Sequence, residues 1–261
     1  MAWSDASGVS LRYELAGTGP ASLVLLHELG GSLESWDAVV PLLAIQCRLL
    51  RYDHRGAGLF EKVRAPYAMA DHVADLTALL AAAGLTPPFY LAGAAMGAAI
   101  AVAYAARMPE QVAGLILCAP ALGVDADRRQ YLIDRSTRAA RDGMRAVVDD
   151  TLDRSYPPVV RRDPATYATY RARFLANDPV SYGLANRAFA DSTVAADAPS
   201  VTCPCLLLAG EHDGLRPATQ VRALAASMPQ AGFELLDSGH LMSVQAPAAL
   251  AARILRFISE Q

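Results

Sequence analysis

The chain has 261 residues, a length that suits one α/β domain, or one such domain with an inserted segment, better than two independent domains. Its 53% hydrophobic residues can fill a buried sheet, and its net charge of −3 argues against nucleic acid or an anionic membrane as partner. No run approaches the roughly 18 apolar residues of a membrane span, and the polar first ten residues lack the order of a signal peptide, so we expect a cytoplasmic protein.

Short apolar runs alternate with amphipathic segments along residues 1–122, the pattern of βα units around a parallel sheet. Residues 10–15 alternate with a period of two and predict an antiparallel edge strand. Buried strands are predicted next, at 22–26, 48–52, 89–92 and 112–119. Helices are predicted between them, at 33–44, 69–83 and 97–107.

The character of the sequence changes between residues 123 and 199. Strand-like runs vanish, charged residues of both signs multiply, and Pro157, Pro158, Pro164 and Pro179 divide the stretch into short helical pieces. Its aromatic residues are too frequent for a disordered linker. The segment therefore predicts a helical cap inserted into an α/β core made of residues 1–122 and 200–261.

The α/β pattern returns after residue 200, with strands predicted at 205–209 and 232–236 and helices at 218–227 and 247–257. The order of elements predicts an α/β fold, a mostly parallel sheet with helices on both faces. The four cysteines, Cys47, Cys118, Cys203 and Cys205, lie in apolar segments without the spacing of a zinc site. We expect no metal, no cofactor and a small-molecule substrate; a homodimer is neither required nor excluded.

Three short motifs carry the chemistry. Residues 25–31 (LLHELGG) follow a buried strand, residues 93–97 (GAAMG) join a strand to a helix, and residues 238–240 (SGH) follow the last strand. Their order and context resemble the α/β-hydrolase superfamily, in which HGxGG carries the oxyanion loop, GxSxG is the nucleophile elbow and a late GH supplies the base. Residues 30–37 (GGSLESWD) and 51–58 (RYDHRGAG) most resemble the 3-oxoadipate enol-lactonase-like branch.

The resemblance implies a role for each matching position. His240 would be the general base and Asp213, in residues 210–213 (GEHD), would orient it. The amides of Leu29 and Met96 would form the oxyanion hole, since the second opens a helix and points a partial positive charge at the site. Trp36, Phe60, Met96 and Leu241 are candidate walls of the substrate pocket.

The sequence departs from this family at three positions. Ala95 stands where the elbow has serine, Glu28 replaces the first glycine of HGxGG, and Phe60 stands where serine is expected after the DxRGxG turn. Alanine cannot attack a carbonyl, so an acyl-enzyme through position 95 is impossible. A carboxylate at position 28, near His240, would be a second acid–base group; alternatively, Glu28 turns to solvent or pairs with an arginine.

Three explanations of Ala95 remain open. In the first, the site is serine-free by origin, with His240 activating water or deprotonating the substrate directly and Glu28 assisting; three departures in one pocket favour this explanation. In the second, the protein is a serine-to-alanine variant of an ordinary esterase or lactonase. In the third, it is a non-catalytic binding protein. The predicted cap contains twelve arginines and eleven aspartates, and one or two of the arginines would hold a substrate carboxylate.

Overall fold

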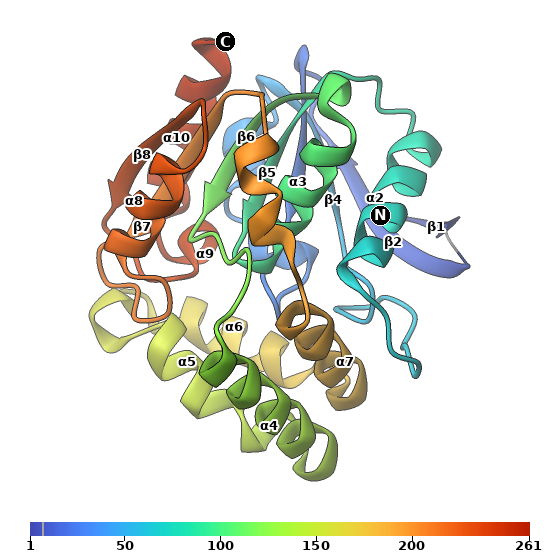
Figure 1. Ribbon diagram of the computed structural model, residues 1–261, viewed down its shortest axis with the longest axis vertical. Coiled ribbons are helices and arrows are strands. Elements are labelled where there is room, and N and C mark those ends of the chain that lie inside the picture. The colour runs from blue at the N-terminus through green and yellow to red at the C-terminus, as the bar shows by residue number, and fades with distance from the viewer. Residues whose placement is uncertain (7) are drawn as a thin grey trace.

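A computed structural model describes residues 1–6 and 8–261 and contains an eight-stranded sheet with the strand order β1-β2-β4-β3-β5-β6-β7-β8 (Figure 1). The strands are β1 (Ala2–Ala6), β2 (Val9–Ala16), β3 (Ala21–Leu26), β4 (Cys47–Tyr52), β5 (Phe89–Ala94), β6 (Val112–Cys118), β7 (Cys205–Gly210) and β8 (Ala231–Leu236). β2 pairs antiparallel with both β1 and β4. All other neighbouring pairs, from β4 across to β8, are parallel. The predicted α/β fold with a mostly parallel sheet is confirmed.

The helices are α1 (Val40–Leu43), α2 (Met69–Ala82), α3 (Met96–Arg107), α4 (Ala126–Asp142), α5 (Val148–Ser155), α6 (Pro164–Leu175), α7 (Pro179–Ala190), α8 (Ala218–Ala226), α9 (Met242–Gln245) and α10 (Pro247–Ser259). Single 3-10 turns are η1 (Leu33–Trp36), η2 (Pro109–Gln111), η3 (Met144–Ala146), η4 (Pro158–Val160), η5 (Val194–Ala196) and η6 (Ala198–Ser200). None of the described helices combines the length and the apolar character that crossing a membrane requires.

Two of the expected elements differ in the structure. β2 is not the edge strand, because residues 2–6 form β1 outside it. The helix expected over residues 33–44 is instead the turn η1 followed by the short helix α1. Pro41 explains the break, since proline lacks the amide that a continuous helix would need there and is tolerated only in a first turn.

Apolar side chains pack on both faces of the sheet and hold the strand ends in fixed positions. One core cluster joins the sheet to α2, α3 and α8, and a second joins its other face to α1 and α10. The central strands β3, β5 and β6 are almost continuously buried, as expected for parallel strands covered on both sides. The loops that leave their carboxyl ends therefore start from a rigid base.

Helices α4 to α7 come from residues 123–199, here called the helical segment, and gather on one side of the sheet (Figure 1). Three of them begin at an aspartate whose side chain accepts backbone amides of the first turn: Asp125, Asp163 and Asp178. Pro164 and Pro179 follow two of these caps, at the first helical position. Each of these two helices therefore begins with an aspartate cap followed directly by proline.

Candidate active site

The sharpest turn at the carboxyl edge of the sheet lies between β5 and α3. Ala95 there has φ 49° and ψ −107°, angles that L residues rarely adopt. The turn needs glycine on both sides, because a Cβ on Gly93 would collide with the Gly97 carbonyl and a Cβ on Gly97 with the Leu26 carbonyl. The local backbone is that of an elbow that presents one side chain, and that side chain is a methyl group.

His240 and Asp213 lie at the ends of loops that follow β8 and β7. His240 Nδ1 is 2.8 Å from Asp213 Oδ2, and Asp213 Oδ1 accepts the amides of Leu215 (2.7 Å) and Arg216 (3.0 Å). Burial alone would raise the pKa of Asp213, but His240 and these amides lower it. The ionised carboxylate only accepts, so the His240 proton is on Nδ1 and Nε2 is left as a base.

The loop that carries His240 is tied to the helical segment. The His240 amide donates to the Ser155 carbonyl (3.2 Å), and the Gln245 side-chain amide donates to the same oxygen (2.9 Å). Gln245 Oε1 accepts the amide of Gly239 (2.7 Å), one residue before His240. The end of α5 therefore helps to place the histidine.

Glu28 is buried, with 3% of its surface exposed. Its Oε1 accepts hydrogen bonds from Ser35 Oγ (2.8 Å) and from the hydroxyl of Tyr170 in α6 (2.7 Å). Burial, and then the charge of Glu28, raise the pKa of Tyr170, so its hydroxyl stays protonated and donates. A Cβ at Gly31 would collide with Glu28 Oε1, which explains glycine at that position. Glu28 neither faces solvent nor pairs with an arginine.

These groups meet at one cavity of about 70 Å³, here called the central cavity. Its core side includes Glu28, Leu29, Ala95, Met96, Leu215, Arg216, His240 and Leu241. Its other side is formed by the helical segment, including Arg128, Leu132, Arg135, Tyr170, Phe174 and Phe189. The core loops and the helical segment thus enclose the same space.

Two expected walls are elsewhere. Trp36 is fully buried in the core cluster with α1 and α10, and Phe60 is buried in the cluster with α2 and α3, so neither lines the central cavity. Both side chains are large and apolar, and the interior of the core buries more of their surface than a cavity wall would. Leu241 and Met96 do line it.

Backbone amides of Leu29 and Met96 can serve as oxyanion donors. Both residues line the central cavity, on the loop after β3 and at the first position of α3. The first amide of a helix has no partner within that helix, and among residues 1–6 and 8–261 the Leu29 amide donates to no other backbone carbonyl outside the regular elements. Two donors on neighbouring loops are the usual device for stabilising an oxyanion.

The remaining histidines and the cysteine nearest the elbow have structural roles. His27 Nε2 accepts the His54 amide (2.9 Å), and its Nδ1 lies 2.7 Å from the Glu28 carbonyl, so His27 joins the oxyanion loop to the loop after β4. His54 and His72 are buried beside it. Burial raises the pKa of Cys118 to about 12, which leaves that thiol protonated and no substitute for the missing nucleophile.

The structure also identifies which arginines face inward. Arg128 and Arg135, on α4, and Arg216, on the loop after Asp213, line the central cavity. In the sequence, Arg128 and Arg135 are two of twelve arginines in residues 123–199 that nothing distinguishes from one another, and Arg216 lies outside that stretch. The available signal for Arg216 was its position three residues after Asp213, on the same loop.

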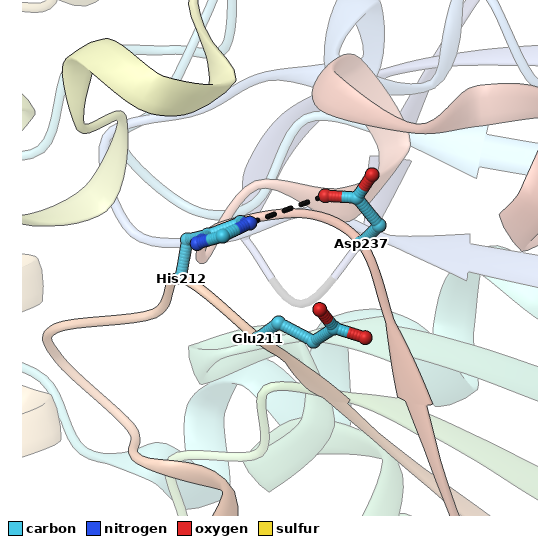
Figure 2. A group of neighbouring side chains, drawn as sticks. All are labelled: Glu211, His212 and Asp237. Carbon is cyan, nitrogen blue, oxygen red and sulfur yellow. Dashed lines mark hydrogen bonds and ion pairs between the residues drawn. The ribbon is translucent and has the colours of Figure 1, made fainter.

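Glu211, His212 and Asp237 form the one group of potential metal ligands found among the described residues (Figure 2). His212 Nε2 lies 3.2 Å from Asp237 Oδ1, and the other oxygen of Asp237 pairs with Arg162 at 2.6 Å. Asp237 is 60% exposed. We interpret the group as a surface ion-pair network, because a cation would compete there with a guanidinium and with water.

Comparisons with known proteins place this geometry in context. A family model described as serine aminopeptidase, S33, matches residues 20–239. A protein of Azorhizobium caulinodans named as the carbamate hydrolase RutD is 27% identical over 100% of this chain and 99% of its own length. A thermophilic esterase from Thermogutta terrifontis, in a malate-bound structure, superposes with a TM-score of 0.93 at 25% identity, covering 99% of this chain and 98% of that one. The enol-lactonase from Burkholderia xenovorans has a TM-score of 0.93 at 27% identity, covering 99% of this chain and 100% of that one.

Proposed function

We propose that this chain, which belongs to the serine aminopeptidase S33 family of α/β-hydrolases, acts without a serine nucleophile on a small carboxylated ester, lactone or ketone. That it is a hydrolase of small substrates follows from its family and from its hydrolase relatives. The serine-free mechanism is supported by one observation above all. An intact His240–Asp213 pair, a buried carboxyl at Glu28 and a methyl group at Ala95 face the same cavity.

In the proposed mechanism His240 acts as the general base. Nε2 takes a proton from water, which attacks the substrate carbonyl in the space that a serine hydroxyl would fill at position 95. The amides of Leu29 and Met96 stabilise the tetrahedral oxyanion. When it collapses, the bond to the leaving oxygen breaks and the proton on His240 passes to that oxygen.

Glu28 is proposed as an auxiliary acid or base. Its Oε1 is held by Ser35 and Tyr170, which fixes the carboxyl group toward the cavity without neutralising it by a cation. It can therefore exchange a proton with water or with the leaving group. With a β-keto acid, the bond between the α-carbon and the carboxylate would instead break, CO2 would leave, and the amides would stabilise the enolate until its carbon takes up a proton from water, which is decarboxylase chemistry. In lyase chemistry, His240 would take a proton from the substrate as a carbon–carbon bond breaks and return it to the carbon of the enolate.

The helical segment is proposed as a cap that encloses the substrate. It supplies one side of the central cavity and contacts the loop of His240. Such enclosure excludes bulk water and strengthens electrostatic interactions at the reacting atoms.

A second candidate is an ordinary serine esterase or lactonase whose serine has been replaced by alanine. The elbow favours this alternative, because the strained angles of Ala95 and the two flanking glycines are the features that a reactive side chain there would require. A third candidate, a non-catalytic binding protein, is disfavoured by the preserved hydrogen bond between His240 and Asp213.

Kinetics on a panel of small esters, enol-lactones and β-keto acids separates these candidates. We would assay the protein with Ala95 together with the variants Ala95→Ser, Glu28→Gln and His240→Ala. Turnover by the Ala95 protein that disappears in His240→Ala and falls in Glu28→Gln supports direct base catalysis. Turnover that requires Ala95→Ser, and that a serine-directed phosphonate blocks, would instead support the second candidate.

A further inference from the structure

Four arginines that line the central cavity or the larger cavity next to it, Arg128, Arg135, Arg154 and Arg216, form what we call the arginine cluster. Across the described ranges 1–6 and 8–261, no carboxylate oxygen lies within 4.0 Å of any of these four guanidinium groups. Their neighbours in the helical segment behave differently. Arg129 pairs with Asp191 at 2.6 Å and Arg171 with Asp149 at 2.9 Å, both on the outer surface.

The cluster is assembled around an aromatic ring. The guanidinium carbons of Arg128, Arg135 and Arg154 lie 4.8, 5.5 and 5.4 Å from the centre of the Tyr131 ring. Each gains a cation–π contact there, but the three charges are brought close together. Burial, and then the charges of Arg135, Arg216 and Arg154, lower the pKa of Arg128. A bound anion would relieve this repulsion.

Neutral oxygens hold two members of the cluster in place. Arg135 is buried and donates through Nε and Nη2 to the Asn186 side-chain oxygen. Arg216 Nη2 donates to the Gly123 carbonyl (3.1 Å). These contacts orient the guanidinium groups but do not neutralise their positive charge, because the acceptor oxygens are uncharged.

A second, larger cavity, here called the outer cavity, adjoins the central one. Its volume is about 640 Å³, and Arg128, Leu215 and Arg216 line both cavities. Arg154 lines only the outer cavity and Arg135 only the central one. By volume the central cavity holds about five water molecules, taking roughly 10–15 Å³ for each, so it admits only the reacting end of a substrate.

Charge in the outer cavity is unbalanced. Three guanidinium groups line it, from Arg128, Arg154 and Arg216, and Asp125 is the only carboxylate among its described lining residues. Asp125 already accepts the Arg128 amide (2.7 Å) as the N-cap of α4. Three positive charges less one negative leave an excess of two.

We propose that the arginine cluster binds a doubly charged anionic group, a phosphate or a pair of carboxylates, on the substrate whose carbonyl end enters the central cavity. The proposal rests on the proposed function for the placement of the carbonyl. The binding site itself does not depend on turnover. Guanidinium groups suit this role because their planar donors match carboxylate and phosphate oxygens.

Isothermal titration calorimetry with inorganic phosphate, malonate and acetate at equal ionic strength tests the site. We expect phosphate or malonate to bind at least tenfold more tightly than acetate, and the better of the two identifies the group. Arg154→Met, an exposed position, and Arg216→Met should each weaken that binding about tenfold. Arg129→Met is the matched control, since Arg129 is adjacent in α4 but paired with Asp191, and it should leave binding unchanged.

His240→Ala separates this proposal from the proposed function, because it removes the base but leaves the arginine cluster intact. Unchanged phosphate or malonate binding in His240→Ala, whatever the turnover, supports the anion site. Equal affinity for acetate and the dianions would overturn it. So would equal binding by Arg129→Met and by Arg154→Met and Arg216→Met, with circular dichroism showing that the variants are folded.

Discussion

The two sides of the central cavity differ in how their polar groups are satisfied. On the core side, Asp213 accepts from His240 and from two backbone amides, so each side chain of this pair has a hydrogen-bond partner, and Ser155 of the helical segment also contacts the His240 loop. On the helical side, Arg128 and Arg135 face the cavity without any carboxylate partner among the described residues. In the proposed account the core supplies the acid–base groups, and the helical segment, together with Arg216 of the core, supplies positive charge for recognition.

Glu28 crosses this division. It belongs to the oxyanion loop of the core, but one of its two hydrogen-bond donors is Tyr170 of the helical segment. The division can therefore be tested on each side separately and at the Glu28–Tyr170 contact, which joins the two sides at the cavity.

The largest effect is expected on the core side. His240→Ala should lower kcat/KM by about 10²–10⁴-fold, the contribution of a positioned general base. His212→Ala is the control, since the His212 side chain does not line the cavity, although it lies on the same loop as Asp213, and its ring instead contacts the exposed Asp237 at 3.2 Å. Comparable losses in both variants, measured by initial rates, would refute a special role for His240.

The contact between the two sides should have an intermediate effect. Tyr170→Phe leaves buried Glu28 with one donor, a change that costs about 1–3 kcal/mol and lowers kcat about tenfold or more if Glu28 takes part in the reaction. Tyr167→Phe in the same helix is the control, because its ring packs against Tyr156 outside the central cavity. An unchanged kcat in Tyr170→Phe would exclude Glu28 from the chemistry.

The smallest effect concerns stability of the core behind the site. Burial, and then Arg55 and His27, lower the pKa of His72 from 6.5 to about 3. Between these values the unfolded state binds more protons than the folded state, so the contribution of His72 to stability falls as the pH falls below 6.5. At pH 5 this amounts to about 2 kcal/mol, at 1.36 kcal/mol per pH unit.

His72→Phe isolates that contribution from those of other titrating groups. Neither ring nitrogen of His72 has a hydrogen-bond partner among the described residues, so phenylalanine loses no contact there. Urea unfolding should show similar stability at pH 7 and a gain of about 2 kcal/mol for the variant at pH 5. An equal difference between the two proteins at both pH values would contradict the assignment.

The elbow could be predicted because it is a local turn, and the His240–Asp213 pair because both residues follow neighbouring parallel strands. Gly93 and Gly97 specify a turn that only glycine permits, and the carboxyl ends of successive parallel strands bring Asp213 and His240 to one edge. Hydrophobic periodicity does not predict the break at Pro41, which depends on a single residue. It does not predict the outer strand β1 either, because residues 2–6 show no clear alternation of apolar and polar residues.

The walls of the cavity could not be predicted in the same way. Trp36 and Phe60 follow motif positions closely, but their side chains turn into the core because that buries more apolar surface. Tyr170 and Arg135 reach the cavity through the packing of the helical segment on the core, which depends on contacts distant in sequence. The spacing of motifs along the chain therefore predicts the candidate catalytic residues better than it predicts the residues that line the substrate cavity.

Mass spectrometry of the intact protein during turnover tests the central claim, catalysis without a nucleophile at position 95, most directly. The account predicts that the Ala95 protein converts many equivalents of an active ester or lactone while its own mass stays unchanged, and that His240→Ala does not. Absence of turnover by the Ala95 protein, with an acyl adduct accumulating on the protein once Ala95→Ser restores activity, would contradict it.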